Sequence, residues 1–251
     1  MPDRQRVLIL GGTSEAVDLA NAVTDRFDII YSLAGRTKEP SIPENATIRT
    51  GGFGGVAALS AWVRGHDVSL VIDATHPFAE QISANAANAC KMTGTPRLRL
   101  LRPAWDTVPG DSWHRADDVA DAARLLPLLG RAAFLSVGRK ELNAFAGLRA
   151  MRFLIRTVDP LNSLPLLRAE RIIGRGPFTL EQETALMREH KIDVLVSKNS
   201  GGNKTYAKIA AARILSIPVV MIKRPCFPSG VTVDNIGEAL EWLKLREQKT
   251  T

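Results

Sequence analysis

The sequence predicts an α/β protein with two similar halves, each built around an open and mostly parallel sheet, and with a ligand cleft between the halves. Short apolar runs alternate with amphipathic stretches along the chain, which is typical of βαβ units. The second half then repeats the order of the first. A composition of 45% hydrophobic and 24% charged residues over 251 positions suits a soluble protein that buries a core.

The elements of the first half follow the hydrophobic pattern. Short runs of apolar residues predict strands, and stretches with helical periodicity predict helices. In chain order these are strand 7–10, helix 15–24, strand 29–33, the short run 47–49, helix 55–64, strand 69–72, helix 78–92 and strand 97–101. Their alternation predicts a parallel sheet, because parallel strands need long crossover connections.

The second half repeats this rhythm. Its expected strands are 132–137, 151–156, 171–173, 194–197 and 219–222. Thr179, followed three residues later by Gln182, has the pattern of a capping box and predicts the start of a helix that runs toward His190.

The two halves also resemble each other in detail. DATHPFAEQISANAANACKMTGTPRLRLLRP and VSKNSGGNKTYAKIAAARILSIPVVMIKRP both read as strand, polar loop, Ala-rich helix, strand and closing Arg-Pro. Pro96 and Pro218 are 122 positions apart, as are Pro103 and Pro225. A loop, a short strand and a helix follow each Arg-Pro. We therefore expect two Rossmann-like domains, 1–106 and 107–251, with a soft boundary between 104 and 131.

Charge and composition narrow the class of function. A net charge of +7 favours an acidic partner, but the basic residues are scattered and aromatics make up only 6%, which disfavours nucleic acid. The two cysteines lack metal-type spacing and predict no disulfide framework. No signal peptide or membrane span is expected. These features favour a cytoplasmic protein, a monomer or small homo-oligomer, without metal.

A glycine pair follows the first strand. Such a turn lets backbone N–H groups approach a ligand, and the next helix offers its positive N-terminal end, so the turn predicts a phosphate site. The residues concerned are Gly11, Gly12, Thr13, Ser14 and Glu15. The pattern departs from GxGxxG, and the alternative is a tight turn with Thr13 or Ser14 as the N-cap.

The end of the second strand bears on the cofactor. Arg36 and Lys38 stand where an NAD-binding protein usually has an acid, and a guanidinium there can pair with a 2′-phosphate. NADPH is therefore favoured over NADH. The alternative is a solvated basic loop.

Two further loops of the first half belong to the same sheet edge. One holds Gly51, Gly52, Phe53 and Gly54 and lets backbone pass near a flat ligand, unless it is simply a flexible turn. The other, DATHPF, places Ala74, Thr75 and His76 toward the phosphates, ribose or nicotinamide. A lone histidine is more often structural than catalytic, so His76 is a candidate only.

The corresponding loops of the second half are rich in cations and hydroxyls. They can hold carboxylates or phosphates, although a Gly-rich turn with solvated lysines is the alternative. The candidate residues are Arg139, Lys140, Lys198, Asn199, Ser200, Gly201, Gly202, Lys204, Thr205 and Lys223.

Taken in order, GGTSEA, AGRT, GGFGG, DATHPFA and SKNSGGNKTYAKIAAARILSIPVVMIKRP resemble the precorrin-6A reductases of cobalamin biosynthesis over nearly the whole chain. The resemblance implies hydride transfer from NADPH to one double bond of precorrin-6A, giving precorrin-6B, without flavin or metal. In many relatives the position of Asn199 carries Asp, which argues against an acid role for this position. The proton is expected from water, His76 or Lys198.

Such a substrate agrees with the residues. A corrin precursor is a large flat polycarboxylate, and a basic protein with cationic loops suits it. Two rival readings stay open: an NADP-dependent reductase of another small anionic substrate, and a two-lobed protein that binds an anionic metabolite without chemistry.

Overall fold

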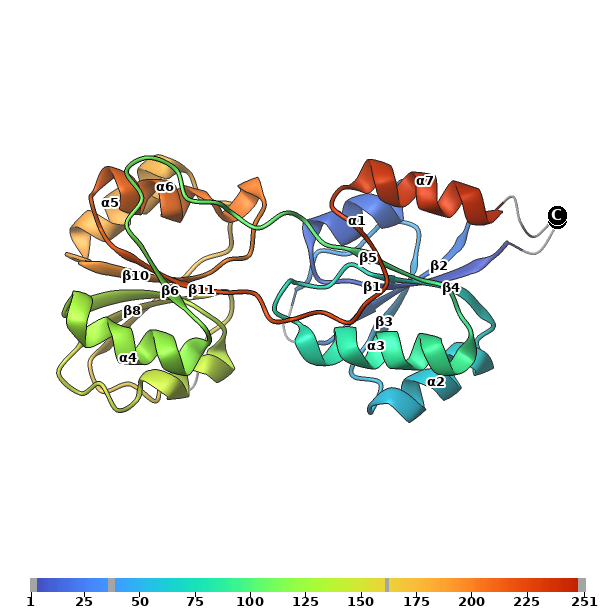
Figure 1. Cartoon of the computed structure of the whole chain (residues 1–251), viewed down its shortest axis with the longest axis horizontal. Helices are drawn as coiled ribbons and strands as arrows, with labels where there is room; N and C mark the ends of the chain where they lie inside the picture. The colour runs from blue at the N-terminus through green and yellow to red at the C-terminus, as the bar shows by residue number, and fades with distance from the viewer. Residues whose placement is uncertain (1–3, 36–38, 161–162, 248–251) are drawn as a thin grey trace. The chain divides into compact units, whose positions relative to one another are not determined.

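The chain folds into two separate units in a computed structural model that describes residues 4–35, 39–160 and 163–247. The first unit comprises the chain up to Pro103 and again from Pro225 onward, and the second comprises Ala104–Arg224. Each unit contains one six-stranded sheet in which every neighbouring pair of strands is parallel (Figure 1). The expected class of two parallel α/β halves is confirmed.

The first sheet has the order β12-β5-β4-β1-β2-β3. Its strands are β1 (Arg6–Leu10), β2 (Asp28–Leu33), β3 (Thr47–Thr50), β4 (Val68–Asp73), β5 (Arg97–Leu100) and β12 (Val231–Val233). Alternate residues of β1 pack on opposite faces, because side chains alternate along a strand. Val7 and Ile9 join one apolar cluster, whereas Leu8 and Leu10 join another.

Helices cover both faces of this sheet. Helices α1 (Ser14–Asn21) and α7 (Ile236–Glu247) pack on the face of Val7, and α2 (Val56–Gly65) and α3 (Glu80–Thr93) pack on the other (Figure 1). Leu19 of α1 and Leu243 of α7 are fully buried there. The central strand β1 is therefore apolar on both faces, as a parallel sheet with two helical layers requires.

The second sheet has the order β6-β11-β10-β7-β8-β9. Its strands are β6 (Trp113–Ala116), β7 (Ala132–Ser136), β8 (Arg152–Thr157), β9 (Ala169–Ile173), β10 (Val194–Lys198) and β11 (Val219–Ile222). Helices α5 (Leu180–Glu189) and α6 (Ala207–Ile214) share one apolar cluster with the sheet. Helix α4 (Val119–Leu129) lies on the other face beside the 3₁₀ helix η1 (Arg139–Phe145) (Figure 1). The short η2 (Asn203–Thr205) precedes α6.

The capping box expected at the start of α5 is confirmed. Thr179 Oγ1 accepts a hydrogen bond from Gln182 N at 3.2 Å, and Thr179 N donates to Gln182 Oε1 at 2.9 Å. These reciprocal bonds satisfy two backbone donors that the helix itself leaves without acceptors.

Each unit takes one edge strand and the helix after it from the segment that follows the Arg-Pro of the other unit. Strand β6 follows the first Arg-Pro but pairs with β11 of the second sheet, and β12 follows the second Arg-Pro but pairs with β5 of the first. The expected second domain, 107–251, differs from this arrangement, because residues from Pro225 onward return to the first unit. The segments behind the two Arg-Pro pairs have the same pattern, so local sequence does not specify which sheet each one joins.

Candidate functional site

The first sheet has a topological switch point between β1 and β4. From β1 the chain proceeds outward to β2 and β3, whereas β4 leads to β5 on the other side. The loops after β1 and β4 therefore diverge and leave a crevice at the carboxyl edge, the usual ligand position in such sheets. A small pocket lies there, lined by Thr13, Glu15, Thr75, Pro77, Leu100, Leu101 and Arg102.

The turn after β1 needs both of its glycines. A Cβ on Gly11 would lie 2.2 Å from Tyr31 Cζ, so the backbone passes against the buried ring. Gly12 has a φ of +108°, and its N–H donates to Tyr31 Oη at 3.1 Å. Burial raises the pKa of Tyr31, which keeps this hydroxyl neutral. Sequence alone pointed to the glycine pair but not to the ring behind it.

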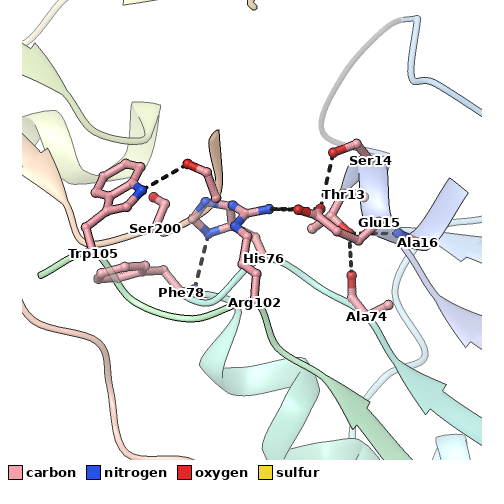
Figure 2. Close-up of polar contacts among 12 residues, drawn as sticks. Thr13, Ser14, Glu15, Ala16, Ala74, His76, Phe78, Arg102, Trp105 and Ser200 are labelled. Carbon is pink, nitrogen blue, oxygen red and sulfur yellow. Dashed lines mark hydrogen bonds and ion pairs between the residues drawn. The ribbon is translucent and has the colours of Figure 1, made fainter. Parts of the chain in front are cut away.

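Thr13 joins the loops after β1 and β4. Its Oγ1 donates to Ala74 O at 2.8 Å and accepts from Ala16 N at 3.1 Å as the N-cap of α1 (Figure 2). The N-cap alternative weighed for this residue is thus present in the structure. The hydroxyl orders the turn and aims the N-terminal end of α1 at the crevice.

Glu15 stands beside this turn and pairs with a residue that sequence analysis missed. Arg102 Nη1 lies 3.0 Å from Glu15 Oε2 and 3.2 Å from Oε1, and Ser14 Oγ donates to Oε2 at 3.2 Å (Figure 2). The guanidinium offsets a carboxylate that would otherwise repel an anion at the turn. The only sequence signal for Arg102 was the repeated Arg-Pro.

The loop after β4 is anchored by a buried acid. Asp73 is fully buried, accepts from Thr75 Oγ1 at 2.7 Å and pairs with Arg99 Nη1 at 3.1 Å. His76 Nδ1 accepts from Phe78 N at 3.2 Å (Figure 2), which leaves the proton of a neutral ring on Nε2. Thr75 and His76 Nδ1 therefore both form local hydrogen bonds that order this loop.

The remaining loops of this edge follow β2 and β3. Gly51–Gly54 lies between β3 and α2, as expected from the short run before it. Arg49, missed by sequence analysis, binds the carbonyls of Gly51 and Gly52. The candidate cations at the end of β2, Arg36 and Lys38, lie outside the described residues.

The second sheet has its own switch point, between β7 and β10. Lys198, at the end of β10, forms an ion pair with Glu141 Oε1, and Gly138 N donates to Glu141 Oε2 at 2.6 Å. Glu141 thus connects the loops after β7 and β10. Sequence analysis did not select it, although it stands five positions after the last residue of β7, as Glu15 does after β1.

Asn199 is held by the backbone of Trp105. Its Oδ1 accepts from Trp105 N at 2.8 Å, and its Nδ2 donates to Trp105 O at 2.9 Å. Arg224 donates to the carbonyls of Asn199 and Ser200 at 2.8 and 3.0 Å. The pair with Trp105 uses an amide as both donor and acceptor, which an ionised Asp could not supply.

The other candidates of the second unit lie on neighbouring loops of the same edge. Arg139 and Lys140 begin η1 after β7, Gly201 and Gly202 follow β10, and Lys204 and Thr205 lie in η2. Lys223 follows β11, and its exposed Nζ lies 2.8 Å from Asp117 Oδ1. Arg139, Lys204 and Lys223 are exposed, so their ammonium and guanidinium groups face solvent at this edge.

Each unit is therefore a doubly wound sheet with glycine-rich loops and cations at its carboxyl edge. Fold and loops together define a two-domain protein of the Rossmann-like class. The chain belongs to the family described as precorrin-6x reductase CbiJ/CobK, whose model matches residues 6–244. It is an oxidoreductase of tetrapyrrole metabolism in cobalamin biosynthesis.

Individual relatives agree with this membership. The chain is 51% identical over 241 residues to a precorrin-6A reductase of Rhodococcus erythropolis, covering 95% of this chain and 97% of that one. A precorrin-6A reductase of a Sinorhizobium species is 44% identical, with coverage of 95% and 92%. A solved structure of CobK precorrin-6A reductase has a TM-score of 0.91 and 41% identity, and the match covers 96% of each chain. The resemblance inferred from the motifs is confirmed.

None of the helices within the described ranges has the length and apolar character of a membrane span.

Proposed function

We propose that the chain catalyses NADPH-dependent reduction of precorrin-6A to precorrin-6B by hydride transfer. The turn at Gly11 and Gly12 carries this proposal, because it stands at the switch point of the first sheet and directly precedes the N-terminal end of α1. The first N–H groups of a helix have no intrahelical acceptor and favour phosphate.

The residues of this edge fit a dinucleotide. Apart from the glycine and its two chain neighbours, no described residue has an atom within 4 Å of the position that a Cβ would take on Gly12, Gly51 or Gly52, so a ligand can approach the backbone there. Arg102 offsets the charge of Glu15. The residues that would hold the cofactor are Gly11, Gly12, Thr13, Ser14, Glu15, Arg36, Gly51, Gly52, Phe53, Gly54, Ala74, Thr75 and His76.

The second sheet would bind the macrocycle through its carboxylates. Exposed cations on three neighbouring loops suit a flat polycarboxylate better than a neutral substrate. The residues concerned are Arg139, Lys198, Asn199, Ser200, Gly201, Lys204, Thr205 and Lys223. Asn199 and Ser200 would act mainly through the loop backbone, since the side chain of Asn199 is bonded to Trp105.

When bound, NADPH supplies the hydride. The chain then has to orient the two reactants, which is the main protein contribution to such a transfer, and to provide a proton. Two side chains can do so: His76, through Nε2–H, and Lys198, whose ammonium is held by Glu141.

The test is a coupled spectral assay with purified protein, NADPH and precorrin-6A. Joint loss of nicotinamide absorbance and change of the macrocycle spectrum is expected. If NADPH is oxidised only when a different acceptor is supplied, the protein is a reductase of another substrate. If ligands bind but NADPH is never oxidised, it is a binding protein. Either result would overturn the proposal.

The cofactor preference has its own test in Arg36→Ala. Loss of a charged hydrogen bond to the 2′-phosphate should raise the KM for NADPH by about 10-fold or more and leave the KM for NADH nearly unchanged. Steady-state kinetics with both cofactors measures this difference. Equal effects on the two would remove Arg36 from the 2′-phosphate.

A further inference from the structure

Arg49 reaches from β3 to the end of β2. Ser32 and Arg49 are register partners in the parallel pair, and Arg49 Nη1 donates to Ser32 Oγ at 3.3 Å. The carboxyl end of β2 is where Rossmann-like domains bind the adenosine ribose of a dinucleotide. The guanidinium therefore stands at the place where cofactors with and without a 2′-phosphate are distinguished.

The Arg49 guanidinium is held in one orientation. Nη1 donates to Gly51 O at 2.5 Å and Nη2 donates to Gly52 O at 2.9 Å. The guanidinium carbon lies 3.6 Å from the centre of the Phe53 ring. Two hydrogen bonds and one stacking contact fix both the plane and the position of the group, so little side-chain entropy remains to be lost when an anion binds.

The charge of Arg49 has no acidic partner in the described parts of the chain. Several other arginines of this unit have one; Arg99, for example, pairs with Asp73, and Arg102 pairs with Glu15. The contacts of Arg49 are neutral carbonyls, a hydroxyl and two aromatic rings, Phe53 and Trp62. Burial lowers the pKa of Arg49 because the charged group has lost part of its hydration. A cation in such surroundings gains more from an anionic ligand than a solvated one does.

We infer that Arg49 is a specificity-determining residue for the phosphorylated cofactor, and that its guanidinium binds the 2′-phosphate of the adenosine ribose. The inference rests on the proposed function and adds a residue to it. A phosphate dianion supplies the negative charge that this group lacks, and the planar guanidinium offers it hydrogen bonds of defined direction.

Equilibrium binding of 2′,5′-ADP and 5′-AMP to the full chain tests Arg49 without turnover. The two ligands differ only in the 2′-phosphate, and isothermal titration calorimetry measures both. We expect the wild type to bind 2′,5′-ADP at least about 10-fold more tightly. Arg49→Ala should lose about 10-fold or more in affinity for 2′,5′-ADP and less than about 3-fold for 5′-AMP.

Two further variants separate charge from loop order. Arg49→Gln retains an amide donor for the Gly51 carbonyl without the charge, and it should lose the preference as Arg49→Ala does. Arg64→Ala removes an exposed arginine from the last turn of α2 and serves as the charge-matched control, with no change in either affinity. Circular dichroism and thermal unfolding show whether each variant is folded.

The outcomes distinguish an error in the proposed function from an error in the role assigned to Arg49. If the wild type does not prefer 2′,5′-ADP, the phosphorylated cofactor of the proposed function is wrong. If the wild type prefers it and the folded Arg49→Gln variant keeps that preference, or loses affinity equally for both ligands, Arg49 only orders the loop and the inference is wrong.

Discussion

Two acidic residues occupy equivalent positions in the two units. Glu15 stands five positions after the end of β1, and Glu141 stands five positions after the end of β7. Each receives a cation from a later loop. Arg102 pairs with Glu15, and Lys198 pairs with Glu141. At an edge expected to bind anions, each carboxylate holds a cation in place rather than meeting the ligand itself.

Glu141→Gln tests this positioning role. Glutamine can still accept the hydrogen bond from Gly138 N, but it no longer attracts the Lys198 ammonium. We expect kcat/KM for precorrin-6A to fall about 10-fold, with the KM for NADPH unchanged. Steady-state kinetics measures both constants. The control Glu170→Gln alters an exposed acid of β9 that pairs with His190, and it should have no effect. An unchanged kcat/KM in Glu141→Gln would contradict the positioning role.

At the residue scale, the sequence predicts the candidate ligand-binding loops better than it predicts the ion pairs that their side chains form. Glycines and basic residues directly after a strand mark the loops after β1, β3 and β10, because the backbone there needs freedom and the ligand needs donors. Thr75 and His76 mark the loop after β4. The partners of those residues are distant in the chain: Arg102 is 87 positions from Glu15, and Lys198 is 57 from Glu141. Spacing in one sequence contains no signal for such pairs.

At the scale of elements, the first βα unit depends on a close contact between the backbone of its turn and the Tyr31 ring. The β1–α1 turn passes directly over the Tyr31 ring of β2, and Thr13 then caps α1 and binds the loop after β4. The strand, the turn and the helix start were predictable from local pattern. The choice of Gly at position 11 is set by a ring on the neighbouring strand, which only the fold brings near.

Gly11→Ala should therefore destabilise the protein. The new Cβ would overlap the fully buried ring of Tyr31, and such overpacking costs about 1–3 kcal/mol. Urea denaturation monitored by circular dichroism measures the free energy of unfolding. Gly52→Ala is the matched control, since no described atom lies within 4 Å of its Cβ position. Equal stability of the two variants would show that the turn adapts to a side chain.

At the scale of the whole molecule, the similarity of the two halves was predictable from the sequence, and the exchange of strands between them was not. The chain can be divided into a first half with β1 to β6 and a second half with β7 to β12. When the strands are counted from the start of each half, both sheets have the same strand order, and the sixth strand of each sheet comes from the other half. Each half contributes a strand and a helix that pack in equivalent places: α7 contacts β5 and α1, and α4 contacts β11 and η1. Local patterns specify that a segment forms a strand, but the edges of β5 and β11 offer it equivalent partners.

The exchange predicts that neither half folds alone and that both fold together. A cut between Gly130 and Arg131, after α4 and before β7, gives fragments 1–130 and 131–251 that each hold elements of both units. Without the second fragment, the first lacks β12 and α7, so the apolar surface beneath Ala239 and Leu243, both fully buried in the intact chain, faces water.

Co-expression of the two fragments should give a 1:1 complex that elutes with the full chain in size-exclusion chromatography and unfolds in a cooperative thermal transition. Fragment 1–130 expressed alone should aggregate or lack that transition. Fragment 104–251 is the control, since it contains every element of the second unit and should show a transition by itself. A stable, cooperatively unfolding monomer of 1–130 would mean that the first sheet does not need β12 and α7.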